Sequence, residues 1–235
     1  SVTSAMRSRI STRAFLPDKP VPLDVIKEIL EVACRAPSGG NTQPWHLYVT
    51  AGEARKELIR ALSRPRSSDT PPGPAPLTYS VYPPGNAAPA AFAERRRKLA
   101  HEMWALMGVD RNDQVARQAA LMRNFDFFGA PVGIIVTVDR ACDRNGWGHV
   151  GMLLQSICLL AEERGLATCL QEAWGNLGRA VYDALGISAE AEVVWCGIAL
   201  GYADTAAPVN SLRTAREPPS AFARFLGFPQ DAAQG

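Results

Sequence analysis

The sequence predicts a three-layer α+β fold, in which helices cover both faces of a central sheet. Three observations favour this class. Four apolar runs read as strands, and they alternate with segments of helical periodicity. One of these runs, residues 132–138, is almost continuously apolar, which is typical of a buried central strand. The chain has 235 residues, 47% of them hydrophobic, and this is enough for one domain with a substantial core.

The spacing of apolar residues gives the expected element order. The predicted strands cover residues 46–50, 132–138, 167–171 and 193–200. The predicted helices cover residues 1–8, 23–35, 53–62, 91–107, 112–128, 149–164 and 176–185. The helix at 149–164 is apolar on most faces, so we expect it at the centre of a large core or at an oligomer interface.

Two segments depart from this alternation. Residues 63–89 contain eight of the 18 prolines and cannot form a regular helix or a central strand. We expect residues 63–90 to be a long excursion that packs, with helices in 91–128, as a lid; the alternative is a disordered insertion. Residues 201–235 show no clear period at first and are expected to form an extended C-terminal arm.

Composition excludes several classes of function. A net charge of +2 gives no argument for nucleic-acid or membrane binding, and no apolar run is long enough to span a bilayer. The first residues lack the apolar core of a signal peptide. The five cysteines form no C-x-x-C pair and the three histidines show no zinc spacing, so no metal site is expected. Together these features predict a cytoplasmic location.

One loop, residues 36–45, is richer in hydrogen-bonding groups than a connector requires. Ser38, Asn41 and Gln43 can all donate hydrogen bonds. Two glycines between them let the backbone approach a partner group. The loop suits a flat ligand with a polar edge, although a well-capped turn is the alternative.

Two further motifs make the pattern specific. Near the start stands Arg9-x-Ser11-x-Arg13-x-Phe15, and near the end a basic segment contains Arg213 and Arg216. With the loop at 36–45, in this order and spacing, the chain resembles the FMN-dependent nitroreductase family from about residue 7 to residue 218. No Gly-x-Gly-x-x-Gly follows a strand and no P-loop is present, so a Rossmann dinucleotide site is not indicated.

The resemblance implies a nitroreductase-like α-β-α fold for residues 1–235, built as a single domain around a mostly antiparallel sheet. It also implies a domain-swapped homodimer, with the apolar helix at 149–164 in the interface. No interaction with nucleic acid or membrane is expected.

The resemblance also implies the flavin site. Alternate positions of an extended segment point the same way, so Arg9, Ser11 and Arg13 would together meet the FMN phosphate. The residues implied to bind the cofactor are Arg9, Ile10, Ser11, Arg13, Pro37, Ser38, Asn41, Gln43, Glu172, Ala173, Arg213 and Arg216. Pro37 and Ser38 would come from the partner subunit. Candidates for an aromatic substrate pocket are Tyr82, Phe125 and Phe128.

The activity implied is that of an FMN-dependent NAD(P)H oxidoreductase that reduces nitroaromatic or quinone-like compounds in a ping-pong cycle. FMN would be tightly bound, and NADPH or NADH would be a transient hydride donor. The flavin provides the redox chemistry, so no catalytic side chain is expected. The alternatives are another flavoenzyme of this fold, such as a dehalogenase or an enal or semialdehyde reductase, and a flavin-binding protein without turnover. Ser11 counts against a flavin-fragmenting enzyme, whose motif resembles Arg-x-Asp.

Overall fold

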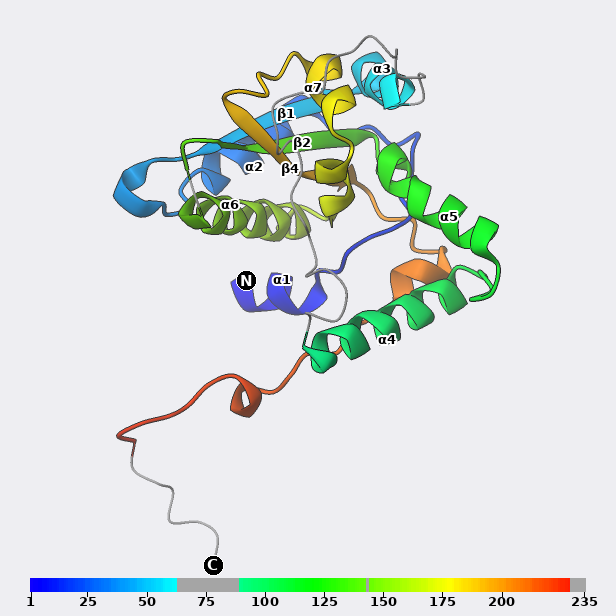
Figure 1. Cartoon of the computed structure of the whole chain (residues 1–235), viewed down its shortest axis with the longest axis vertical. Coiled ribbons are helices and arrows are strands. Elements are labelled where there is room, and N and C mark those ends of the chain that lie inside the picture. The colour runs from blue at the N-terminus through cyan, green and yellow to red at the C-terminus, as the bar shows by residue number, and fades with distance from the viewer. Residues whose placement is uncertain (63–88, 143, 229–235) are drawn as a thin grey trace, which may run out of the picture.

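The computed structural model describes residues 1–62, 89–142 and 144–228 (Figure 1). The expected excursion at 63–90 lies almost wholly outside these residues, and so does Tyr82.

A four-stranded antiparallel sheet forms the central layer. Its strands, in spatial order, are β1 (Trp45–Ala51), β2 (Val132–Asp139), β4 (Glu192–Gly201) and β3 (Ala167–Gln171). Each neighbouring pair is antiparallel, as the family resemblance implied. All four strands begin and end within one residue of their predicted bounds. The strands were predictable because their apolar residues are concentrated in short runs. The central strands β2 and β4 are buried along most of their length, whereas the edge strand β1 is only partly buried.

Helices surround the sheet. They are α1 (Val2–Ser8), α2 (Leu23–Ala33), α3 (Gly52–Leu62), α4 (Ala90–Leu106), α5 (Gln114–Met122), α6 (Arg144–Glu163) and α7 (Arg179–Leu185). Figure 1 shows α2 and α6 on one side of the sheet and α3 and α7 on the other, which gives three layers. No helix in the part that the structure describes is long and apolar enough to cross a membrane.

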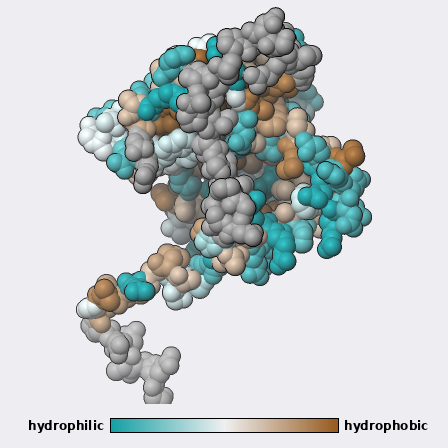
Figure 2. All heavy atoms as spheres, in the orientation of Figure 1, coloured by the Kyte–Doolittle hydropathy of each residue, from teal (hydrophilic) through white to brown (hydrophobic). Residues whose placement is uncertain are grey.

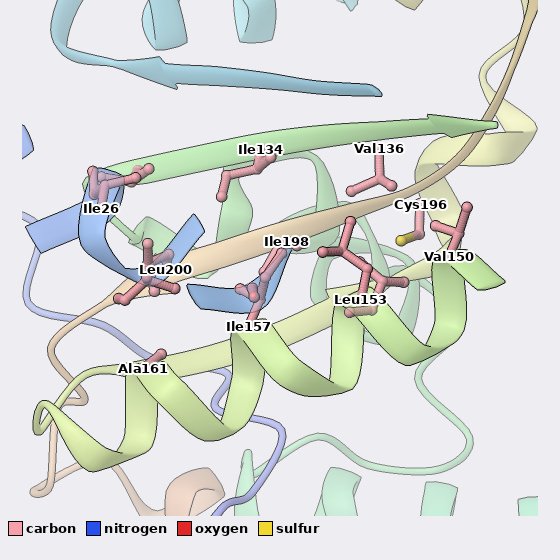
Figure 3. Close-up of a cluster of buried hydrophobic side chains, with 14 of the residues drawn as sticks. Ile26, Ile134, Val136, Val150, Leu153, Ile157, Ala161, Cys196, Ile198 and Leu200 are labelled. Carbon is pink, nitrogen blue, oxygen red and sulfur yellow. The ribbon is translucent and has the colours of Figure 1, made fainter. Parts of the chain in front are cut away.

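The first core cluster fills the space between the sheet and the α2–α6 layer (Figure 3). Ile134 of β2 and Ile198 of β4 are fully buried there, against Ile157 of α6. The apolar helix predicted at 149–164 therefore has a core face, and it extends five residues further toward its N-terminus than predicted.

The second cluster lies on the opposite face of the sheet and contains the largest buried side chains. Trp174 and Phe127 are both fully buried, and their rings stack with centroids 4.5 Å apart. The close fit depends on two strand glycines. A Cβ at Gly133 would lie 2.3 Å from the Phe127 ring, and one at Gly197 would lie 2.4 Å from Trp174.

The helix predicted at 112–128 is wrong in its second half. The α-helix ends at Met122, and residues 123–129 form a 3₁₀ segment, η3 (Arg123–Gly129). Phe127 and Phe128 have φ values of 57° and 53°, in the left-handed region that non-glycine residues rarely adopt. Burial of both rings against the sheet holds the backbone there, and local helical periodicity does not register such a tertiary constraint.

The C-terminal arm leaves the body of the fold and extends away from it (Figure 1). On the way it contacts α4, where Arg95 Nη2 lies 2.9 Å from Glu217 Oε1. Beyond this ion pair the arm exposes four large apolar side chains to solvent: Phe222, Phe225, Leu226 and Phe228.

Candidate functional site

A cavity of about 710 Å³ lies beside the end of β3, between α6 and the α4–α5 pair. We call it the main cavity. It combines an apolar wall from α4 and α5 with a polar rim from the turn after β3. The residues that line it are Arg13, Met103, Met107, Ala120, Leu121, Asn124, Phe128, Gly151, Leu154, Gln155, Cys169, Leu170, Gln171, Glu172, Ala173, Asn176, Trp195 and Cys196.

Arg13 reaches this cavity because the first motif is tied to the sheet edge. The Thr12 N–H donates to the Thr168 carbonyl over 3.0 Å, which adds the segment beside β3. The Arg13 N–H donates to Asn210 Oδ1 over 2.9 Å, while Asn210 Nδ2 donates to the carbonyl of Ala14. The buried amide of Asn210 thus fixes the backbone on both sides of the Arg13 side chain, across almost 200 residues of sequence.

The turn after β3 is held from the η3 segment. One carbonyl, that of Asn124, accepts from Gln171 Nε2 at 2.8 Å and from Trp174 Nε1 at 3.1 Å. These two bonds fix both ends of Gln171-Glu172-Ala173-Trp174. The rim is therefore held by the same 3₁₀ segment that contains Phe127 and Phe128.

Gln171 has an unsatisfied atom at the edge of the main cavity. Its side chain is 2% exposed, and its Nε2 faces a carbonyl, so Oε1 must be the acceptor. Oε1 has no hydrogen-bond donor in the part of the chain that the structure describes. A buried polar atom without a partner costs about 1–3 kcal/mol. A ligand with an N–H or O–H group at this point of the cavity would remove that cost.

Two kinds of titratable group line the main cavity. Partial burial raises the pKa of the Glu172 carboxyl, because the charged form loses solvation. Burial also raises the pKa of the Cys169 thiol, to about 11, so this cysteine is a neutral packing group at physiological pH. Cys158, Cys169 and Cys196 are all buried, as the sequence predicted.

The structure brings four of the predicted residues to the main cavity: Arg13, Glu172, Ala173 and Phe128. Arg9, Ile10 and Ser11 lie on the same tethered segment but do not line the cavity. The Nε of Arg9 is buried without an acceptor in the described chain, so the segment retains an unused donor for an anion.

The basic residues of the C-terminal arm lie outside the main cavity. Arg213 Nη1 donates to the carbonyls of Asn210 and Leu212, at 3.0 and 3.2 Å. Arg216 donates to Thr214 and Ala215, its own neighbours, and both arginines are exposed. Neither arginine lines the main cavity, whereas Arg13 does.

The loop at 36–45 is ordered but also lies outside the main cavity. The Gln43 N–H donates to Ser38 Oγ over 3.0 Å, and the Gly39 N–H donates to His149 Nε2 over the same distance. Asn41 and Gln43 have φ values of 56° and 47°, so the loop is fixed in a conformation that few residues adopt freely. Pro37, Ser38, Asn41 and Gln43 would therefore meet a ligand in this cavity only from a second chain.

Of the aromatic candidates, only Phe128 lines the main cavity among the residues described. Phe125 does not line this cavity in the single chain, and its ring packs edge-on against Trp174 with centroids 5.7 Å apart. The left-handed turn at Phe127 and Phe128 separates the two side chains. Tyr82 lies outside the described residues.

Several lining residues were not anticipated, among them Gln171, Asn124 and Met103. The sequence could have indicated Gln171, since it is a polar residue at the end of a predicted strand and directly precedes Glu172. The others come from distant segments, and no local pattern places them together. No group of three or more residues among the described histidines, cysteines and carboxylates could hold a metal ion.

Comparison with known proteins identifies the family. The model of the Nitroreductase family matches residues 6–202. The chain belongs to the nitroreductase family.

The family includes curated relatives that match almost the full chain. A 4-nitrobenzoate reductase of Pseudomonas putida is 38% identical over 225 residues, which is 96% of this chain and 95% of the relative. A nitrobenzene nitroreductase of Ectopseudomonas oleovorans is 33% identical, over 96% of both chains.

Solved nitroreductase structures share the fold. The FMN and NADPH-dependent nitroreductase NfnB from Sphigopyxis sp. strain HMH superposes with a TM-score of 0.87 at 33% identity, over 97% of this chain and 100% of its own. The FMN-dependent nitroreductase NfnB from Mycobacterium smegmatis in complex with NADPH gives a TM-score of 0.82 at 27% identity, over 95% of this chain and 96% of its own.

Proposed function

We propose that this nitroreductase-family protein is an FMN-dependent oxidoreductase that uses NADPH to reduce nitroaromatic compounds. The observation that supports it best is the main cavity, in which one cation and a fixed polar turn face an apolar wall. FMN has the matching parts, since it combines a charged phosphate with a flat ring edged by donors and acceptors. The named functions of the relatives agree with this reading.

The residues present fit a flavin. Arg13 would hold the phosphate together with Arg9 and Ser11 of the same segment, since a guanidinium binds phosphate oxygens with paired hydrogen bonds. The unsatisfied Oε1 of Gln171 is an acceptor for an N–H of the ring, and Glu172 and Ala173 would border that ring.

The side chains bind and orient, while bound FMN would supply the two-electron redox chemistry. Met103, Leu121 and Phe128 line the main cavity with apolar surface. They would exclude water and hold a flat, electron-poor arene. Protons for the reduction can come from solvent, so no side chain is assigned as an acid or base.

We propose a nitro-substituted benzene, such as 4-nitrobenzoate or nitrobenzene, as the substrate class. Met103, Met107 and Phe128 give the cavity an apolar lining that suits an aromatic ring, and methionine adapts to rings of different shape. The named substrates of the relatives support the same class.

We propose that the functional unit is a homodimer. Two observations support it. The loop residues Ser38 and Asn41 lie outside the main cavity of their own chain, and the C-terminal arm exposes Phe222 and Phe225. A second chain would cover the arm and bring the loop to its partner's cavity. Light scattering should give twice the 25.3 kDa chain mass; a mass of one chain at micromolar concentration would contradict the proposal.

We further propose that the enzyme is a single-domain protein of the cytoplasm, in which α4 and α5 cover the cavity. The free state of its five cysteines supports a reducing compartment.

Nitroarene-dependent oxidation of NADPH tests the proposed function. Under nitrogen, the FMN-loaded protein should oxidise NADPH slowly alone and much faster when 4-nitrobenzoate or nitrobenzene is added, with a hydroxylamino or amino product by chromatography. Rates that no nitroarene changes would contradict the proposal and favour another flavin chemistry or a flavin-binding protein.

A further inference from the structure

A second cavity, of about 450 Å³, lies between α4 and α5. We call it the basic crevice. It is lined by Arg97, Ala100, His101, Trp104, Arg111 and Arg117. Three of these six side chains are cations and none is acidic. Figure 2 shows a largely hydrophilic surface over this pair of helices.

Among the described residues, the cations of the basic crevice have no carboxylate partner. None of Arg97, Arg111 and Arg117 lies within 4.0 Å of a carboxylate in the part that the structure describes. Two acids of the α4–α5 connection are engaged in local turns. Asp110 accepts the Asn112 N–H and Asp113 accepts the Ala116 N–H, so both carboxylates cap backbone groups.

One guanidinium is held in place before any ligand arrives. Arg117 stacks over the Trp104 ring at 4.3 Å and donates from Nη1 to the Arg111 carbonyl over 3.1 Å. Its Nε and the Nε1 of Trp104 are buried without an acceptor in the described residues. The basic crevice therefore contains fixed, unused donors beside the exposed side chains of Arg97 and Arg111, and this combination favours a multiply charged anion such as a phosphate.

The basic crevice is adjacent to the main cavity because the same two helices build both. Met103 of α4 and Met107, directly after that helix, line the main cavity, and Ala100 and Trp104 of α4 line the crevice. Arg97 stands six residues before Met103, roughly 9 Å along a helix that rises about 1.5 Å per residue. A ligand that fills both must be long, flat at one end and anionic at the other.

We propose that the basic crevice binds the 2′-phosphate of the adenosine of NADPH while the nicotinamide lies in the main cavity. This inference rests on the proposed function and extends it to the choice of hydride donor. NADH has a hydroxyl where NADPH has the phosphate, so the crevice selects NADPH.

Substitution of Arg97 and Arg111 by alanine tests the proposal in the FMN-loaded protein. The KM for NADPH should rise about 10- to 100-fold, as expected when charged hydrogen bonds to one phosphate are lost, with kcat and the KM for NADH unchanged. Arg95→Ala is the matched control, since Arg95 is on the same helix but pairs with Glu217. Equal losses for NADPH and NADH would overturn the proposal.

A binding measurement separates this inference from the proposed function. Calorimetric titration with 2′,5′-ADP, which has the phosphate but no nicotinamide, should show binding that 5′-AMP lacks and that the double substitution abolishes. Equal affinity for the two nucleotides, or tighter binding of 4-nitrobenzoate at the crevice, would refute the crevice assignment. Failure of the protein to bind FMN or oxidise NADPH would instead refute the proposed function. The nucleotide titration would still report whether the basic crevice binds the phosphate.

Discussion

Replacement of Trp174 by alanine is expected to destabilise the fold by about 3–5 kcal/mol, the usual cost of removing a large buried aromatic side chain. Trp174 is fully buried, stacks on Phe127 and donates its indole N–H to Asn124. The substitution would leave a cavity and remove that hydrogen bond. For a chain of this size the melting temperature should fall by roughly 6–20 °C.

Urea or thermal denaturation of the FMN-free protein measures this effect, with Trp174→Phe as the matched control. Phenylalanine keeps the stacking against Phe127 and loses only the N–H donor and part of the volume, so its cost should be distinctly smaller. If the alanine variant lost less than about 1 kcal/mol, Trp174 would not be the packing centre of this face of the sheet. The alanine variant should also bind FMN less tightly, because Trp174 fixes the turn that contains Glu172 and Ala173.

Arg13→Ala should weaken FMN binding by about 1.5–3 kcal/mol, the range for a hydrogen bond to a charged group. That corresponds to roughly a 10- to 150-fold higher Kd. Arg13 lines the main cavity, and Asn210 holds its backbone, so the side chain is positioned before FMN arrives. Quenching of FMN fluorescence during titration of the FMN-free protein measures the Kd directly.

Two control variants make the Arg13 result specific. Arg7→Ala removes an exposed charge from α1 and should leave the Kd unchanged. Arg13→Lys keeps the charge but loses the forked donor geometry, and it should fall between the wild type and Arg13→Ala. An FMN affinity for Arg13→Ala within twofold of the wild type would remove Arg13 from the phosphate site.

The strands and most helices were predictable because their signal is local. Each strand is a short apolar run, and the central strands β2 and β4 are buried along most of their length. The helix prediction fails at residues 123–128 because the backbone there is set by a tertiary contact and not by a local pattern. Phe127 and Phe128 adopt left-handed φ values because their rings pack on a sheet that is formed by other parts of the chain. Helical periodicity in the sequence has no access to that contact.

The candidate site also contains residues that were predictable from the sequence and residues that were not. The motif around Arg13 and the turn at Glu172 and Ala173 were expected at the site because each is a short motif that resembles one of the family. The link between Gln171 and Asn124 spans 47 residues and was not predictable from local pattern. The loop that contains Ser38 and Asn41 is ordered, yet a single chain does not bring it to the main cavity. Its predicted role therefore depends on the proposed dimer.

The visible absorption spectrum of the purified protein, recorded before and after addition of NADPH under nitrogen, tests the central proposal most directly. We expect flavin bands that bleach with NADPH and return when 4-nitrobenzoate is added. A protein that shows no flavin bands and does not gain them after incubation with FMN would contradict the account.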